Sequence, residues 1–191
     1  MTAAVFTGCD DDSSSMQNVE MEDLPYGSTL RELSDSKIKI CFDSRYFSDD
    51  AMKTLSDYFY ALETQDVELF KKTLNTDYVD YLEKNGTAKL DDYLKAVYEG
   101  DTQSIGDGLK YTYIEVIDAG DSKSDTKINE ISELMDNVYS ENNKKEKFSD
   151  SVKDAKYASL SVTGELNGKS YTNTNHTIYV FECEDGTYIF N

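Results

Sequence analysis

The sequence is poor in the residues that metal centres and nucleophilic enzymes use. Its 191 residues include one histidine, three cysteines, one proline and no tryptophan. The cysteines have neither CxxC spacing nor histidine partners, which argues against a zinc site and a thioredoxin-like motif. A single histidine, His176, and the lack of a Gly-x-Ser-x-Gly sequence exclude a Ser-His-Asp hydrolase and a papain-like protease. We therefore expect no metal site and no cofactor.

Basic residues are also scarce, because 19 lysines and arginines face 38 acidic residues and the net charge is −19. Such a charge repels nucleic-acid phosphates and anionic lipid headgroups, which argues against nucleic acid as a partner. The oxygen-rich segment 118–125 lacks the ligand order of a calcium loop. No run reaches the roughly 18 apolar residues of a membrane-spanning helix, so membrane attachment would have to use a lipid.

The first 23 residues have a composition of their own. The sequence FTGC at residues 6–9 resembles the lipobox of bacterial lipoproteins, in which small residues precede a cysteine that receives diacylglycerol. The resemblance implies that residues 1–9 are a truncated lipoprotein signal and that Cys9 is lipidated, which would hold the protein at a membrane. Residues 10–23 contain six acidic residues and no basic one, so we expect a flexible tether. The alternative is an ordinary N-terminus that happens to contain Gly-Cys.

If Cys9 carries lipid, two cysteines remain. Cys41 and Cys183 both lie in strand-like runs, IKICF and YVFECE, where a lone buried cysteine is common. We interpret them as free thiols, and a single bridge between them is the alternative.

From residue 24 onward, apolar periodicity and turn signals predict a single α+β domain over 24–191. The expected strands are 36–43, 109–118, 155–166, 169–184 and 187–191, and the expected helices are 49–63, 67–74, 77–84, 90–100 and 126–139. Asn167-Gly168 is a strong hairpin signal, and successive hairpins predict antiparallel strands. Because most helices precede most strands, we expect the helices to pack on one face of the sheet.

The order of these elements resembles the nuclear transport factor 2-like, or cystatin-like, superfamily. The resemblance is carried by the long helix, by the run from Ala61-Leu62 through Asp66 to Phe70, and by the hairpins, and it covers residues 48–191. It implies a cone in which a helix lies inside a strongly curved antiparallel sheet. The chain also resembles small lipoproteins of unassigned function from Gram-positive gut bacteria, which implies an extracytoplasmic location and no particular activity.

The segment LKYTYIEVID contains the sharpest catalytic candidates. Enzymes of the superfamily place an aspartate, a histidine or a tyrosine inside the cone, so Glu115 would be a general base with Tyr111 and Tyr113 as hydrogen-bond donors. The alternative, which we favour, is that Ile114 and Val116 face the core, leaving Glu115 solvated and both tyrosines on the surface. Strand alternation by itself does not say which face is buried.

The remaining candidates are aromatic. Fifteen tyrosines suit a recognition surface, and the pairs Tyr58/Tyr60 and Tyr78/Tyr81 either flank a groove on the helical side or belong to the core. His176 stands in the polar run TNTNHT, and we interpret it as a solvated strand position.

Taken together, these features favour a lipid-anchored extracytoplasmic binding or interaction domain without catalytic activity, whose ligand is a small molecule or a protein. One alternative is an isomerase or dehydratase-like enzyme that uses a cone pocket. The other is a protein inhibitor or cell-wall adaptor.

Overall fold

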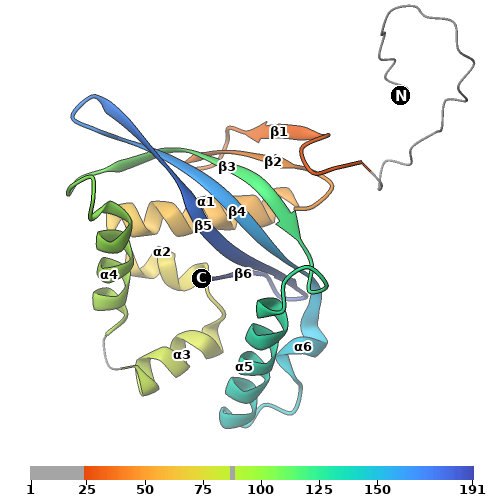
Figure 1. Ribbon diagram of the computed structural model, residues 1–191. Coiled ribbons are helices and arrows are strands. Elements are labelled where there is room, and N and C mark those ends of the chain that lie inside the picture. The colour runs from red at the N-terminus through yellow and green to blue at the C-terminus, as the bar shows by residue number, and fades with distance from the viewer. Residues whose placement is uncertain (1–23, 87–88) are drawn as a thin grey trace, which may run out of the picture.

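A computed structural model describes residues 24–86 and 89–191 of the chain, and the fold of this part is α+β, as expected (Figure 1). The strands are β1 (Leu30–Leu33), β2 (Lys39–Asp43), β3 (Lys110–Gly120), β4 (Val152–Leu166), β5 (Lys169–Cys183) and β6 (Thr187–Phe190). The helices are α1 (Asp49–Thr64), α2 (Val67–Lys72), α3 (Thr76–Asn85), α4 (Leu90–Thr102), α5 (Lys127–Glu141) and α6 (Phe148–Ser151). The proposed lipid site, Cys9, and the expected tether over 10–23 lie outside the described residues.

The six strands form one open, mixed sheet in the order β1-β2-β3-β4-β5-β6. The expectation of an antiparallel sheet is wrong at one place, because β2 and β3 pair in parallel while every other pair is antiparallel. A parallel pair needs a long crossover, and α1–α4 supply it between these two strands. The short edge strand β1 was not expected, since Leu33 is its only buried residue and it lacks an apolar alternation.

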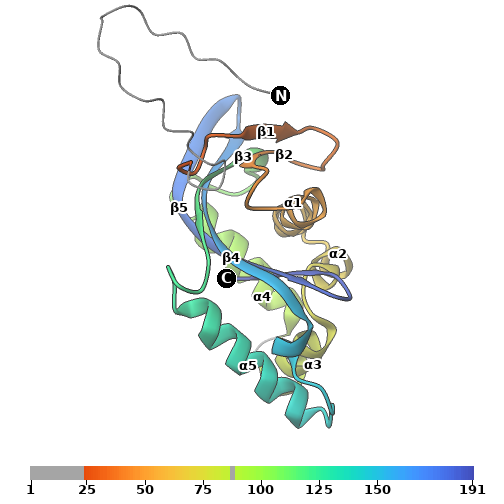
Figure 2. The ribbon, with the colours of Figure 1, turned by 90° about the vertical axis from the view of Figure 1, so that its right-hand side faces the viewer.

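Helices cover both faces of the sheet, so the expectation that they pack on one face is also wrong. Val180 and Phe181 are consecutive in β5, and consecutive strand residues point to opposite faces. Val180 packs in the cluster with α1, whereas Phe181 packs in a second cluster with α5 and α6. Figure 2 shows α1 and α2 beside the long strands and α5 below them. The insertion of α5 between β3 and β4 supplies the cover for the second face.

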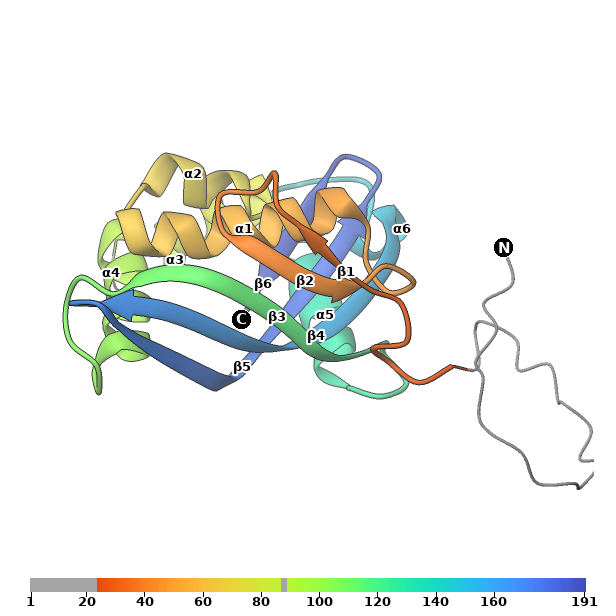
Figure 3. The ribbon, with the colours of Figure 1, turned by 90° about the horizontal axis from the view of Figure 1, so that it is seen from above.

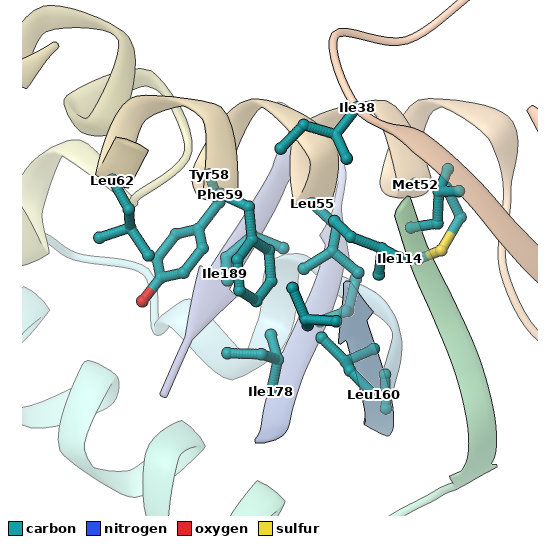
Figure 4. Close-up of a cluster of buried hydrophobic side chains, with 14 of the residues drawn as sticks. Ile38, Met52, Leu55, Tyr58, Phe59, Leu62, Ile114, Leu160, Ile178 and Ile189 are labelled. Atoms are coloured by element: carbon teal, nitrogen blue, oxygen red, sulfur yellow. The ribbon is translucent and has the colours of Figure 1, made fainter. Parts of the chain in front are cut away.

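The helix α1 is the centre of the larger core. The Ser48 hydroxyl accepts a hydrogen bond from the Ala51 backbone N–H, and the helix ends at Gln65 in the left-handed conformation. Its expected apolar face is confirmed and lies against isoleucines and a leucine of the strands (Figure 4); the face consists of Met52, Leu55, Phe59 and Leu62. Burying each such side chain contributes about 1.5–3 kcal/mol. Figure 3 shows how α1 runs along the sheet.

A buried carboxylate secures the first residues of the described chain. Asp43 is fully buried and accepts hydrogen bonds from the backbone N–H of Gly27, from the Thr29 hydroxyl and from the Arg45 guanidinium. The Arg45 hydrogen bonds hold the pKa of the Asp43 carboxyl well below its usual range. The Tyr26 hydroxyl donates to the Val116 carbonyl 3.0 Å away, which fastens the same turn to β3.

Candidate functional site

A β-bulge in β3 decides where the predicted site residues point. The pairing with β4 slips between Tyr111 and Tyr113, so Thr112 is an extra residue in the strand. As a result Tyr111 and Ile114 are both buried, although they are three residues apart. The Glu63 side chain stabilises the bulge, because its Oε2 accepts a hydrogen bond from the Tyr111 backbone N–H at 2.7 Å. Burial raises the pKa of the Glu63 carboxyl.

The bulge separates the three residues of the predicted catalytic group. Ile114 and Val116 are buried on the core side, whereas Tyr113 and Glu115 are half-buried on the opposite side of β3. Tyr111 joins the core side. Burial raises the pKa of Tyr113 to about 12. The structure therefore does not bring Glu115 together with Tyr111, and the arrangement expected of a Glu115 general base is not formed.

Tyr111 instead meets an aspartate and the histidine. Its hydroxyl donates a hydrogen bond to Oδ2 of Asp101, in the last turn of α4, over 3.1 Å. Nδ1 of His176, in β5, lies 3.8 Å from Oδ1 of the same carboxylate. The side chains of Asp101 and His176 keep 20% and 14% of their surface exposed. We call Asp101, Tyr111 and His176 the Asp101 cluster.

The interpretation of His176 as a solvated position is wrong, because strand alternation places it on the same side as the buried Ile178, two residues later. A bulge lies just before it. Between Leu160 and Val162 of β4 there is one intervening residue, whereas between their partners His176 and Asn173 there are two. The extra residue changes the phase of β5, so Asn173, three residues before His176, lies on the same side of the sheet as the imidazole. The polar run TNTNHT thus carries an inward-facing imidazole.

The neighbouring asparagines determine which tautomer the neutral imidazole of His176 adopts. The backbone N–H of Asn175 donates to Oδ1 of Asn173 at 3.0 Å, which directs the Asn173 amide nitrogen at His176 Nε2, 3.1 Å away. An amide nitrogen donates only, so Nε2 accepts. In the neutral imidazole the proton then lies on Nδ1, the nitrogen that faces Asp101.

Aromatic rings surround the cluster. Phe59 of α1 packs edge-on against both Tyr111 and His176, with ring centroids 5.5 and 5.8 Å apart. Tyr98 of α4 packs in the same way on Tyr111 at 6.1 Å. This burial raises the pKa of the Asp101 carboxyl, while His176 and the Tyr111 hydroxyl act in the opposite direction. Among the described residues, no lysine or arginine lies within salt-bridge distance of Asp101.

The tyrosine pairs do not form one groove. Tyr58 is buried in the core, with 2% of its surface exposed, while Tyr60 is half-buried beneath the ammonium of Lys37. Tyr78 and Tyr81 stack on each other with ring centroids 6.4 Å apart. The core alternative holds for Tyr58. Its hydroxyl is the one buried side-chain polar atom of the described residues that has no hydrogen-bond partner.

The cysteines of the described chain form no disulfide, and its other side chains form no metal site. Cys41 and Cys183 are free, which confirms that expectation, and burial raises the pKa of the Cys183 thiol to about 11. No group of three or more His, Cys, Asp and Glu side chains in residues 24–86 and 89–191 could hold a metal ion. In the same residues no helix has the length and apolar character to cross a bilayer.

Two surface cavities of about 560 and 530 Å³ share the segment 144–147. Two lysines that line these cavities form ion pairs with aspartates: Lys144 lies 3.1 Å from Asp77, and Lys147 lies 4.0 Å from Asp136. The Asp101 cluster differs in that aromatic rings pack on its Tyr111 and His176, and its carboxylate has no such cationic partner among the described residues.

The sequence pattern missed Asp101 and Asn173. Neither belongs to a motif, and Asp101 is one of many acids that follow a helical pattern. The only signal was that His176 is the single histidine of the chain. Comparisons with protein families, curated proteins and solved structures found no match to this chain.

Proposed function

We propose that residues 24–191 are a non-catalytic binding domain, held at the outer surface of a membrane by lipid on Cys9, with the Asp101 cluster as its ligand site. The observation that carries the proposal is the contact between the Asn173 amide and His176 Nε2. In the Nδ1–H tautomer Nε2 carries the only free electron pair of the ring, and the amide occupies it, so the imidazole is not available to remove a substrate proton. The partly exposed Asp101 carboxylate, beside two side chains on which aromatic rings pack, is suited to recognition of a ligand.

The fold supports this location for the site. In the proposed architecture α1 and the long strands enclose a cone of the nuclear transport factor 2-like kind. The cluster draws Tyr111 from β3, His176 from β5 and Asp101 from α4, and Phe59 of α1 contacts two of these side chains. Sites built from several elements that converge on one face of a sheet are common for small ligands.

Membrane attachment is tested by metabolic labelling. The chain is expressed behind a complete lipoprotein signal peptide in a bacterium supplied with labelled palmitate. We expect label in the wild-type protein and membrane fractionation, and we expect Cys9→Ser to lose both. Equal labelling of the Cys9→Ser protein would refute the anchor.

The ligand site is tested by NMR with a library of small fragments. Fragments should perturb the His176 ring signals in the wild type, and the perturbation should be lost in Asp101→Asn. Glu115→Gln is the matched control, because it removes a carboxylate on the other side of β3. The site would be refuted if fragments bound only at other surfaces. It would also be refuted if they bound equally well to the Asp101→Asn and Glu115→Gln variants.

The second candidate is a proton-transfer enzyme of the isomerase or dehydratase kind. One observation favours it: burial raises the pKa of Asp101, and the Tyr111 hydroxyl donates to that carboxylate. Asp101 would be the general base, and the hydrogen bond from Tyr111 would hold its carboxylate in position. The test is deuterium exchange into enolisable ketones in D₂O. If the wild-type protein exchanged deuterium faster than buffer alone, and Asp101→Asn did not, the protein would be an enzyme and the non-catalytic proposal would be wrong.

A further inference from the structure

We propose that the Asp101 cluster takes a small protonated amine that also carries a hydrogen-bond acceptor, with the ammonium against Asp101 and the acceptor against the Tyr58 hydroxyl. This inference rests on the proposed function, because it names the class of ligand for the same site.

The first argument is the unpaired hydroxyl of Tyr58. It is fully enclosed and has no hydrogen-bond partner among the described residues. A buried donor without an acceptor costs free energy, and phenylalanine would fill the same space without that cost. A buried hydroxyl that destabilises the free protein has a use if a bound ligand supplies its missing hydrogen-bond acceptor. A ligand with an acceptor oxygen would do so.

The second argument concerns the charge of the ligand. Asp101 has His176 as its only salt-bridge neighbour among the described residues, and the 3.8 Å between Nδ1 and Oδ1 is longer than a hydrogen bond. An ammonium would form a charge-assisted hydrogen bond with the carboxylate and lie against the rings of Phe59 and Tyr98. An anionic ligand would be repelled by the same carboxylate.

The third argument is that both groups belong to one region. Tyr58 and Phe59 are neighbours on α1, their rings lie 5.5 Å apart, and Phe59 contacts Tyr111 and His176. The charge of Asp101 is among the causes that raise the pKa of Tyr58, after its burial. Figure 4 shows the Tyr58 hydroxyl at the end of the ring that is farthest from α1.

The exposures suggest the path of entry. Asp101 and His176 are partly open to solvent, whereas the Tyr58 hydroxyl is enclosed. The ammonium end therefore docks first, at Asp101.

The experiment compares matched probes on the full chain by NMR and calorimetry. Phenethylamine, 2-phenylethanol and phenylacetate have similar size and differ in charge, and we expect only the amine to perturb the His176 ring signals. Adding a hydroxyl acceptor, as in 2-amino-1-phenylethanol, should tighten binding about fivefold, the effect of one hydrogen bond. In Tyr58→Phe the two amines should bind equally.

Asp101→Asn should weaken both amines at least about tenfold, the loss of one charge-assisted contact, while Glu115→Gln should leave them unchanged. If the alcohol or the acid perturbed the His176 signals and the amine did not, the ligand would not be a protonated amine. The proposal that the Asp101 cluster is a ligand site would still stand. Equal binding of both amines to wild type would overturn the role of Tyr58. If no amine perturbs His176 at millimolar concentration, the inference is wrong, and the fragment library decides separately whether the site binds anything.

Discussion

The amide nitrogen of Asn173 lies 3.1 Å from Nε2 of His176 and thereby leaves Nδ1 directed at Asp101. The two polar residues are three apart in β5, and the bulge between them places both side chains on the core side. The hydrogen bond that one ring nitrogen makes determines which nitrogen of a neutral histidine carries the proton.

The first prediction concerns the tautomer of His176. At about pH 8, above the ordinary histidine pKa, ¹⁵N NMR should show the proton on Nδ1. In Asn173→Ala the donor to Nε2 is removed, so the Nε2–H tautomer should become populated. A dominant Nε2–H tautomer in the wild type would contradict the assignment.

The second prediction compares two tyrosines by denaturant unfolding. Tyr58→Phe removes an unpaired buried hydroxyl and should raise the free energy of unfolding by about 1 kcal/mol. Tyr111→Phe removes the hydrogen bond to Asp101 and should lower it by about 1–2 kcal/mol. If Tyr58→Phe were destabilising, its hydroxyl would have a partner in the folded protein.

The third prediction concerns the buried hydroxyl of Ser56, which accepts from the Ile38 backbone N–H at 2.8 Å. Ser56→Ala deprives this N–H of its buried acceptor and should cost about 1–3 kcal/mol of unfolding free energy. Thr54→Ala is the control, because its hydroxyl bonds within the exposed part of α1 and its loss should cost about 0.5 kcal/mol or less. Equal effects of the two substitutions would argue against the Ser56 contact.

The fourth prediction concerns Asp43 and pH. Because the folded protein lowers the pKa of this carboxyl below its unfolded value of 3.8, its stabilisation is present above about pH 4 and is lost as the pH falls toward the folded pKa. Asp43→Asn leaves Arg45 beside a neutral amide and should cost about 3 kcal/mol at neutral pH. Urea unfolding of both proteins should show this difference shrinking on acidification; a difference independent of pH would exclude the charge as its source.

The fifth prediction concerns Glu115. The side chain is half-buried on the face of β3 that is opposite to the Asp101 cluster. Glu115→Gln should therefore change the free energy of unfolding by less than about 0.5 kcal/mol and leave ligand binding unchanged. A loss of binding in this variant, measured with any fragment that binds the wild type, would restore Glu115 as a site residue.

Much of the secondary structure follows from local chemistry in the sequence. The three- and four-residue spacing of Met52, Leu55 and Phe59, with Ser48 before it, specifies α1 because capping and amphipathicity act within one or two helical turns. Asn167-Gly168 specifies the β4–β5 hairpin, since both residues adopt the positive φ that its tight turn requires. These determinants lie within a few residues of one another, so a sequence pattern can reveal them.

The tertiary structure decided which residues form the candidate site. The bulges at Thr112 and before His176 each add one residue to a strand, and one residue is enough to turn a side chain to the other face. The parallel pairing of β2 with β3 and the cover of the second face by α5 likewise depend on contacts between distant segments. Asp101 and His176 are 75 positions apart and meet only after the strands between them have paired, so no local pattern could place them together.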